Sequence, residues 1–453
     1  MLKCKYDNSK KMAGSSVEKT VSMNMKVLIL AVPSIISNIT VPLLGLVDMA
    51  IVGHLGSAAY IGAVAVGGLL FNVLYWNFGF LRMGTSGLAS QAYGRRDFRE
   101  MFSVLLRAIE VAWGLSLLFI VFRHFIADAA FYLIDTEPEV RVLAEKYFLI
   151  NIWAAPAVLG LYALKGWFIG MQNSKTPMLV AIFINVMNIC LSLFFVYFMD
   201  MGIEGVALGS ALAQISGLLL AVFLWVKFYS GHFIRFLDKK ALFNTDGLGA
   251  FFKLNLGIVI RTMCLVTVTS FFTIAGTKQG ITVLAVNTLL MQLFTLFSYF
   301  MDGFAYAGEA LVGKYIGAKD KCNLKKVIES IFMWGGSLAL VFTALYGFFA
   351  SEFIAFLTDK PDVVKEAAKY YFWVLAIPFA GFSAFLWDGV CVGATAVKTM
   401  AWTMIIATAT FFLLYFSFID KFGNHAIWLS FVCYLAMRSI AQTIWAKCNL
   451  LRI

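Results

Sequence analysis

Residues 42–56 read Pro-Leu-Leu-Gly-Leu-Val-Asp-Met-Ala-Ile-Val-Gly-His-Leu-Gly. They close an apolar run that begins near Val27, and this run exceeds the roughly 20 residues that cross a bilayer. One carboxylate, Asp48, lies late in the run. A charge at such depth is unfavourable by about 2.5–3.5 kcal/mol on insertion scales, so the group is expected to be protonated or paired. The stretch predicts a membrane helix whose acid either couples transport or is satisfied by its neighbours at the helix end.

The composition of the whole chain is that of a helical protein that crosses the membrane many times. Of its 453 residues, 61% are apolar and 13% are charged, about half the charged share of a soluble protein. The net charge of +11 is scattered over short connections, which fits a positive-inside bias and not a nucleic-acid partner. Neither HxxxH nor CxxC spacing occurs, and no nucleophile–base set is evident. We therefore expect no metal, no cofactor and no intramembrane enzyme.

Twelve apolar runs are long enough to span a bilayer. They fall at about 26–52, 59–91, 104–134, 144–170, 176–199, 204–229, 250–276, 281–312, 327–357, 366–393, 399–419 and 425–447. Basic residues gather in alternate connections: Arg95, Arg96, Arg99, Lys175, Lys227, Lys239, Lys240, Lys314, Lys319, Lys321 and Lys398. The positive-inside rule places these connections and both termini in the cytoplasm.

A single offset of 223 residues relates the two halves of the chain. It places Gly94 on Gly317 and Asp97 on Asp320, and continues without a gap to the start of the fifth crossing of each half. An ordered set of matches at one offset indicates an internal repeat. Each repeat holds an even number of crossings, so the two are parallel, which is an arrangement found in transporters.

The fold class predicted from this repeat is an all-α integral membrane protein. We expect twelve transmembrane helices in two parallel six-helix bundles around a central cleft. The expected boundaries are a cytoplasmic tail at 1–25, an N-lobe at 26–229, a cytoplasmic linker at 230–249 and a C-lobe at 250–453.

Polar residues of the fifth and sixth crossings are candidates to join Asp48. Asn185, Asn188 and Ser192 follow one another at i, i+3 and i+7, which places them on one helix face, and Ser210 lies in the sixth crossing. If this face turns towards Asp48, it forms a small polar pocket inside the first bundle. The alternative is that these groups only hold helices together by hydrogen bonds.

The second half carries several intramembrane charges. Arg438 and Glu309 are expected to form structural ion pairs, because unpaired charges at this depth are costly. Asp302 is a candidate for substrate or proton handling. Arg82 is expected either to pair with it across the halves or to act as a gate.

Residues that could line a substrate cleft complete the list of candidates. They are Tyr75, Trp76, Phe71, Phe294 and Arg261, with ordinary packing as the alternative for each aromatic ring.

Several motifs resemble those of the MATE (multidrug and toxic compound extrusion) transporters. They are Val-Asp-Met-Ala-Ile-Val-Gly-His-Leu-Gly at 47–56, Gln-Ala-Tyr-Gly-Arg at 91–95, Gly-Met-Gln-Asn-Ser-Lys-Thr-Pro at 170–177 and Gly-Ile-Glu-Gly-Val-Ala-Leu-Gly-Ser at 202–210. The segments at 80–87 and 301–313 look more like the DinF-type branch. The resemblance covers nearly the whole chain after residue 25.

This resemblance implies an inner-membrane antiporter that expels organic compounds, which we expect to be amphipathic or cationic. The parallel repeat indicates a rocking motion of the two bundles, and nothing in the sequence requires more than a monomer. The family's coupling acid corresponds to Asp48, and its helper residues to Asn188 and Ser210. Where the family has a second acid on the fifth helix, this chain has Ser192. One carboxylate in place of two favours H⁺ coupling, with Na⁺ as the alternative.

A flippase for lipid-linked oligosaccharides is the other candidate that resembles this architecture. Arg82, Arg261 and Lys165 could hold its pyrophosphate, although Asp48 argues against that function.

Overall fold

The computed structural model describes residues 21–53, 57–134, 137–233, 248–357 and 360–450. These residues form helices and short connections, without a strand among them, and twelve of the helical spans are long and apolar enough to cross a membrane. The predicted all-α membrane fold is therefore confirmed.

The first half of the chain contains α1 to α9. Its elements are α1 (Met23–Gly53), α2 (Ala58–Trp76), α3 (Phe80–Arg95), α4 (Phe98–Val121), α5 (Arg123–Leu133), α6 (Pro138–Asn151), α7 (Ala155–Gly170), α8 (Lys175–Leu193) and α9 (Gly202–Phe233). Short 3-10 turns join α2 to α3 and α6 to α7, so each of these pairs makes one crossing.

The second half contains α11 to α17. Its elements are α11 (Leu248–Thr277), α12 (Ile281–Gly317), α13 (Lys321–Phe348), α14 (Ala350–Leu357), α15 (Pro361–Gly393), α16 (Val397–Phe422) and α17 (Asn424–Trp445). Most of the predicted linker, residues 234–247, and residues 1–20 of the predicted tail lie outside the described residues.

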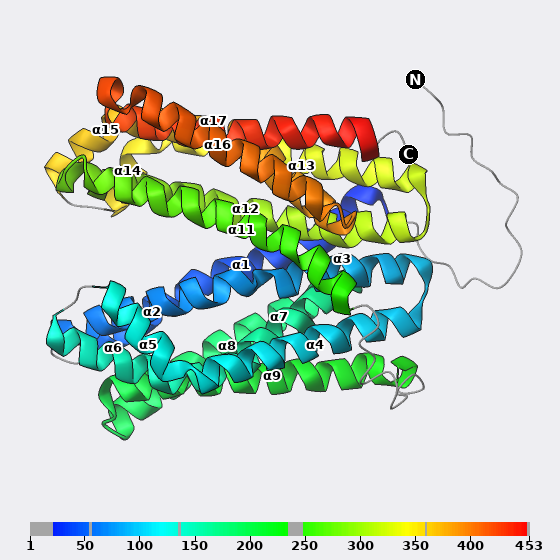
Figure 1. The fold of residues 1–453 in the computed structure, drawn as a ribbon, viewed down its shortest axis with the longest axis horizontal. Helices are drawn as coiled ribbons and strands as arrows, with labels where there is room; N and C mark the ends of the chain where they lie inside the picture. Colours follow the sequence, from blue (N-terminus) through cyan, green and yellow to red (C-terminus); the bar gives the residue numbers. More distant parts are fainter. Residues whose placement is uncertain (1–20, 54–56, 135–136, 234–247, 358–359, 451–453) are drawn as a thin grey trace, which may run out of the picture.

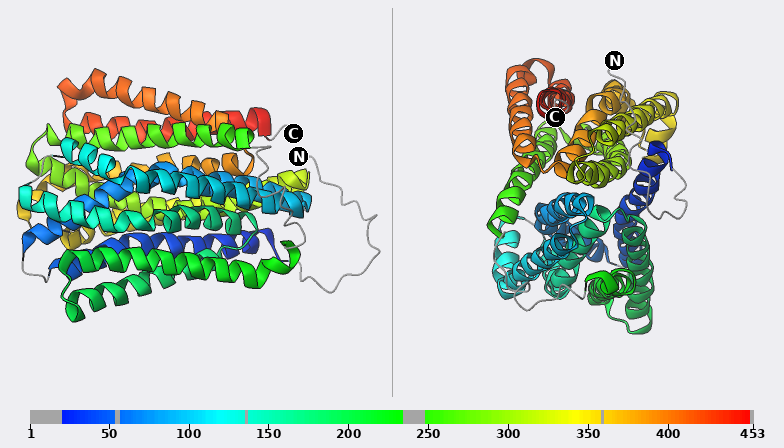
Figure 2. Two further views of the ribbon diagram at one scale, coloured as in Figure 1. Left: turned by 60° about the horizontal axis from the view of Figure 1, so that its bottom comes forward. Right: turned by 90° about the vertical axis from the view of Figure 1, so that its right-hand side faces the viewer.

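The helices form two groups that follow the order of the chain (Figure 1). One end of the molecule carries the connections with Arg95, Arg96, Lys175, Lys319 and Lys398, and we call it the basic end. The two groups lie together at this end and diverge towards the opposite one (Figure 1). Seen from the basic end, α1 and α11 lie at opposite edges of the boundary between the groups (Figure 2).

The structure repeats itself at the offset found in the sequence. Asp97 and Asp320 cap α4 and α13, each accepting a hydrogen bond of 3.0 Å from a backbone amide three residues later. Gly94 packs against the Lys314 carbonyl, while Gly317 packs against the Gln91 carbonyl. A side chain at either glycine would overlap the opposite backbone. This reciprocal pair brings α3 and α12 into close contact, as small residues allow between membrane helices.

The halves are joined by hydrogen bonds near the basic end. The Gln91 side-chain amide donates to the Gly393 carbonyl at 2.9 Å, and that of Gln172 donates to the Ala310 carbonyl at 2.7 Å. Further along, the Asn38 amide donates to the Tyr299 carbonyl at 3.5 Å. These contacts lie between the basic end and the middle of the helices, which agrees with the divergence beyond that level.

Helix α1 contacts both halves. Its first part packs on the second half, where Gly303 of α12 lies against Ile35, and its last part packs on α8 and α9. Pro33 and Pro42 lie inside the helix, and proline removes a helix hydrogen bond and favours a bend. The Ile29 carbonyl, four residues before Pro33, accepts a hydrogen bond from the Ser174 hydroxyl at 3.2 Å.

Candidate functional site

The structure brings Asp48 together with two of its predicted partners. The Ser210 hydroxyl of α9 donates to Asp48 Oδ2 at 3.3 Å, and the Asn188 amide of α8 donates to the Ser210 oxygen at 2.7 Å. All three side chains are buried, with Asp48 only 5% exposed. Three helices of the first half therefore converge on one carboxylate, and the partners they supply to it are neutral.

Several oxygens in this pocket have unused bonding capacity. Asp48 Oδ1, Asn188 Oδ1 and the Ser192 hydroxyl are buried without a hydrogen-bond partner in the described part of the chain. Buried polar atoms in native proteins are nearly always bonded, so such a group calls for an explanation. An added proton, a water molecule or a cation would each satisfy oxygens arranged in this way.

Tyr147 of α6 is a pocket residue that sequence reasoning missed. It is 5% exposed, and its hydroxyl lies close to Ser210 and Asn151. Gly67 of α2 makes room for its ring. No spacing within α6 distinguishes this tyrosine from the other aromatic residues of the chain, so the sequence offered no signal for it.

The other two predicted pocket residues differ in their placement. Ser192 is fully buried beside Gly209 of α9, next in sequence to Ser210. Asn185 instead donates to the Thr40 carbonyl of α1 at 2.9 Å, two helical turns from Asp48. It holds α8 against α1 at a level nearer the basic end than the pocket, and it is not bonded to the Asp48 carboxylate.

A second polar cluster surrounds Asp388 of α15 in the second half. Its Oδ2 accepts bonds from Arg261 at 3.0 and 2.6 Å and from Arg438 at 2.6 Å, while its Oδ1 accepts from Gln442 at 2.7 Å. Asp388, Arg438 and Gln442 are buried. The expected structural pairing of Arg438 is observed, and Arg261 belongs to the same cluster instead of standing free in a cleft.

Arg82 forms an ion pair that links the two halves, but with a different acid from the one considered first. Its guanidinium binds both oxygens of Glu309 at 2.9 and 3.2 Å and lies 4.0 Å from the ring centre of Tyr306. The suggestion that Arg82 pairs with Asp302 is therefore wrong. Glu309 is two helical turns nearer the basic end of α12, where α3 approaches more closely.

Asp302 is partly exposed and makes no ion pair with any residue that the structure describes. It lies close enough to Arg261 and Arg82 for attraction between their charges. This placement puts it between the Arg82–Glu309 pair and the Asp388 cluster.

The aromatic candidates divide between the core and the surface. Tyr75 stacks on Phe71, which stacks in turn on Phe148 inside the first half, and Phe294 packs on Phe385 and Phe431 inside the second. These rings make packing contacts within their own halves, as the packing alternative predicts. Trp76 is 55% exposed at the end of α2, so it remains a candidate to line an open surface.

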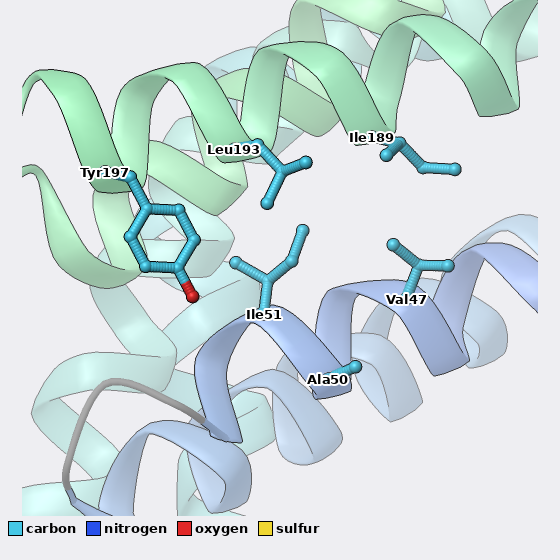
Figure 3. Close-up of a pocket in the computed structure, with 6 residues that line it drawn as sticks. All are labelled: Val47, Ala50, Ile51, Ile189, Leu193 and Tyr197. Carbon is cyan, nitrogen blue, oxygen red and sulfur yellow. The ribbon is translucent and has the colours of Figure 1, made fainter.

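An apolar pocket lies between α1 and α8, beside the Asp48 pocket (Figure 3). Its lining consists of Val47, Ala50, Ile51, Ile189, Leu193 and Tyr197. None of the predicted polar residues lines it, and the one polar side-chain group among these lining residues is the Tyr197 hydroxyl.

Comparison with solved structures identifies the fold. A crystal structure of a MATE transporter in the bent conformation matches with a TM-score of 0.84 at 18% identity, covering 95% of this chain and 96% of that one. An outward-facing structure of a multidrug resistance MATE transporter matches with a TM-score of 0.81 at 16% identity, with 95% and 96% coverage. These two likenesses show that the protein has the fold of these transporters.

Sequence comparison gives the family. The MatE family model matches residues 33–194 and 258–418. DNA damage-inducible protein F of Escherichia coli is 34% identical over 422 residues, which cover 92% of this chain and 91% of that protein. Multidrug and toxin extrusion protein 1 of Danio rerio is 26% identical over 364 residues, or 76% and 58% of the two chains. This chain belongs to the MATE family and is similar to its DinF branch.

Proposed function

We propose that this transporter exports organic compounds across the plasma membrane in exchange for protons, with Asp48 as the residue that carries the proton. The observation that supports this role is the set of neutral partners around a buried carboxylate. A carboxylate without a fixed positive partner can gain and lose a proton without leaving a buried charge unpaired. Asp388, which two arginines bind, cannot do so.

The proposed cycle couples the charge of Asp48 to the shape of α1. When the transporter is open away from the basic end, a proton binds to Asp48 and substrate leaves. The halves then rock, and the proton departs at the basic end, which we propose faces the cytoplasm together with both termini. Pro33 and Pro42 lie on either side of the α1 segment that joins the pocket to the second half. A bend in this segment would transmit the change in the charge of Asp48 to the second half.

The energy for this exchange comes from the proton gradient. Each proton that moves inward releases about 2.3 kcal/mol per 100 mV of membrane potential. A difference of one pH unit adds about 1.4 kcal/mol. The two together are sufficient for uphill export of a small molecule.

The ion pair between Arg82 and Glu309 is proposed to act as a gate. It lies between the two halves on the side of the basic end, where the halves are in contact, and it joins Arg82 of α3 to Glu309 of α12. Rocking towards the other state would separate these helices and break the pair. We propose that the transporter works as a monomer. Trp76 and Asp302 are proposed to contact substrate at the edge of the region where the two halves diverge.

Sodium is a second candidate for the coupling ion. The three unpartnered oxygens of the pocket, on Asp48, Asn188 and Ser192, are of the kind that hard cations prefer. Against sodium stands the single carboxylate, which leaves the pocket with one negative charge for the ion.

Transport in proteoliposomes tests the proposal. Efflux of a panel of dyes and metabolites is measured under a proton gradient alone and under a sodium gradient alone. We expect wild-type efflux under the proton gradient and its loss in Asp48→Asn, with Asp128→Asn, an exposed acid of α5, as the matched control. Full proton-driven efflux by Asp48→Asn would overturn the assignment of the coupling residue, and efflux driven by sodium alone would overturn the proposed ion.

A further inference from the structure

Lys165 is a charged residue between the halves that the ion pairs described above do not include. It lies on α7, at the position that corresponds to Asp388 in the repeat, and its side chain is partly exposed. Its ammonium donates to the Ser37 hydroxyl near the middle of α1 at 3.3 Å and lies 5.8 Å from the ring centre of Tyr306 on α12. The group is therefore held where α1, α7 and α12 meet.

The charges around Lys165 do not balance it. The connected set contains four cations, Arg82, Lys165, Arg261 and Arg438, and three acids, Asp302, Glu309 and Asp388. Glu309 binds Arg82, Asp388 is shared by Arg261 and Arg438, and Asp302 attracts Arg261 and Arg82. After the three arginines are matched with the three acids, the charge of Lys165 remains.

The immediate electrostatic surroundings of Lys165 agree with this count. Among the charges that act on it, Arg82 has the largest single effect and repels it, and Asp302 and Glu309 each attract it less strongly. No carboxylate of the described residues forms an ion pair with it. An ammonium has three hydrogens to donate, and the described contacts use one of them.

An ammonium that has no ion-pair partner among the described residues and lies deep in a membrane protein is costly, and such residues usually mark a substrate pathway. The polar and aromatic groups next to it are those of a binding site: Ser37 and Asn38 of α1 and Tyr299 and Tyr306 of α12. Both tyrosines are partly exposed, as are Lys165 and Asp302. These groups lie at the level where the contacts between the halves end.

We propose that Lys165 binds an anionic group, a carboxylate or a phosphate, on the compound that this transporter exports. The proposal rests on the proposed export function and names its substrate class, an organic acid or a zwitterion with an apolar body. Such a group would neutralise the excess charge of the cluster. A simple organic cation would instead meet a region of net positive charge, in contrast with the expectation from the family resemblance.

The position of Ser37 gives this site a direct link to the proton pocket. Ser37 and Asp48 lie on the same helix, on either side of Pro42. A bend of α1 that follows protonation of Asp48 would displace the Ser37 hydroxyl, which orients the Lys165 ammonium. Proton uptake could in this way loosen the hold on an anion 11 residues away along the helix.

Equilibrium binding of two matched probes tests the inference without any gradient, so its result is independent of H⁺ coupling. The probes are dansylglycine, which is a carboxylate, and dansylglycinamide, which is neutral. The purified full-length protein is placed in nanodiscs of phosphatidylcholine. We expect dansylglycine to bind wild type more tightly than the amide, and Lys165→Met to weaken its binding by about tenfold or more, as loss of a partly buried charge partner does.

Two further variants and one lipid titration complete the design. Lys165→Arg should retain the preference for the carboxylate, and Lys146→Met, which removes an exposed lysine of α6, should leave binding of both probes unchanged. Equal weakening of both probes in Lys165→Met, or no change in either, would overturn the proposal. Displacement of dansylglycine from wild type by a few per cent of phosphatidylglycerol would also overturn it, because the anion would then be a lipid headgroup.

Discussion

Two buried aspartates of this transporter have opposite surroundings. Asp48, in the first half, has a serine and an asparagine beside it and one oxygen without a partner. Asp388, in the second half, has both oxygens occupied, one by two arginines and the other by a glutamine. The first arrangement allows a proton to come and go, while the second fixes the ionised form and makes it part of the framework.

The repeat sharpens this comparison. The position that corresponds to Asp388 in the first half holds Lys165, and the position that corresponds to Asp48 in the second half holds Phe271. Phe271 packs among the rings of Phe412 and Tyr415. The repeated architecture by itself therefore dictates neither charge, since each half has a different residue at both places. Each acid is present for a purpose of its own half.

The largest expected effect is on stability. Asp388→Asn leaves the partly buried Arg261 and the fully buried Arg438 without their acid. Loss of one partner of a buried pair destabilises a protein by about 3–5 kcal/mol. Asp48→Asn leaves only neutral groups around a neutral side chain and should change stability little. Thermal unfolding of both variants in the same detergent measures the difference. Equal melting temperatures for the two variants would show that the two aspartates do not differ in their contribution to the stability of the fold.

The ion pair between the halves should have the next largest effect. Glu309→Gln leaves Arg82 without its acid and should weaken the contact of α3 with α12. A cysteine at Ser90, a fully buried position of α3 beside Gly313, should then react with a polar thiol reagent about tenfold faster than in the parent protein. The exchanged pair Arg82→Glu/Glu309→Arg should restore slow labelling. Unchanged labelling in Glu309→Gln would show that the pair does not hold the halves together.

A change at Ser192 tests why the first pocket has one carboxylate. Ser192→Asp supplies a second acid near Ser210, where two negative charges would favour a cation over a proton. We expect sodium to accelerate efflux severalfold in this variant. Ser192→Asn has a similar size without the charge and should show no response to sodium. The same sodium response in both variants would mean that charge does not set the choice of ion.

The smallest effect is expected at Ser210, whose hydroxyl donates the described hydrogen bond to Asp48. A hydrogen bond contributes about 0.5–1.5 kcal/mol net, so Ser210→Ala should slow proton-driven efflux by roughly two- to tenfold. Ser216→Ala on the same helix serves as the control. The described hydrogen bond of the Ser216 hydroxyl goes to the Ala213 carbonyl of its own helix. An effect of Ser216→Ala as large as that of Ser210→Ala would indicate general disturbance of α9.

The sequence by itself determined much of the architecture. Runs of apolar residues predict membrane helices because a bilayer leaves the backbone no other way to satisfy its polar groups. The 223-residue offset predicts corresponding structures, and Asp97 and Asp320 do cap corresponding helices. Helical periodicity also placed Asn188 and Ser192 on one buried face of α8. All of these features are patterns along the chain and do not depend on which helices pack together.

Only the tertiary structure decided which distant groups meet. In the structure, Arg82 forms an ion pair with Glu309 and not with Asp302. Arg261 and Arg438 both bind Asp388. Tyr147 lies in the Asp48 pocket. Within the described part of the chain, the tertiary structure also left Lys165 without an ion pair. The rotation and spacing of packed helices fix these contacts, and a shift of one helical turn exchanges one partner for another. A pattern along a single chain carries no information about that shift.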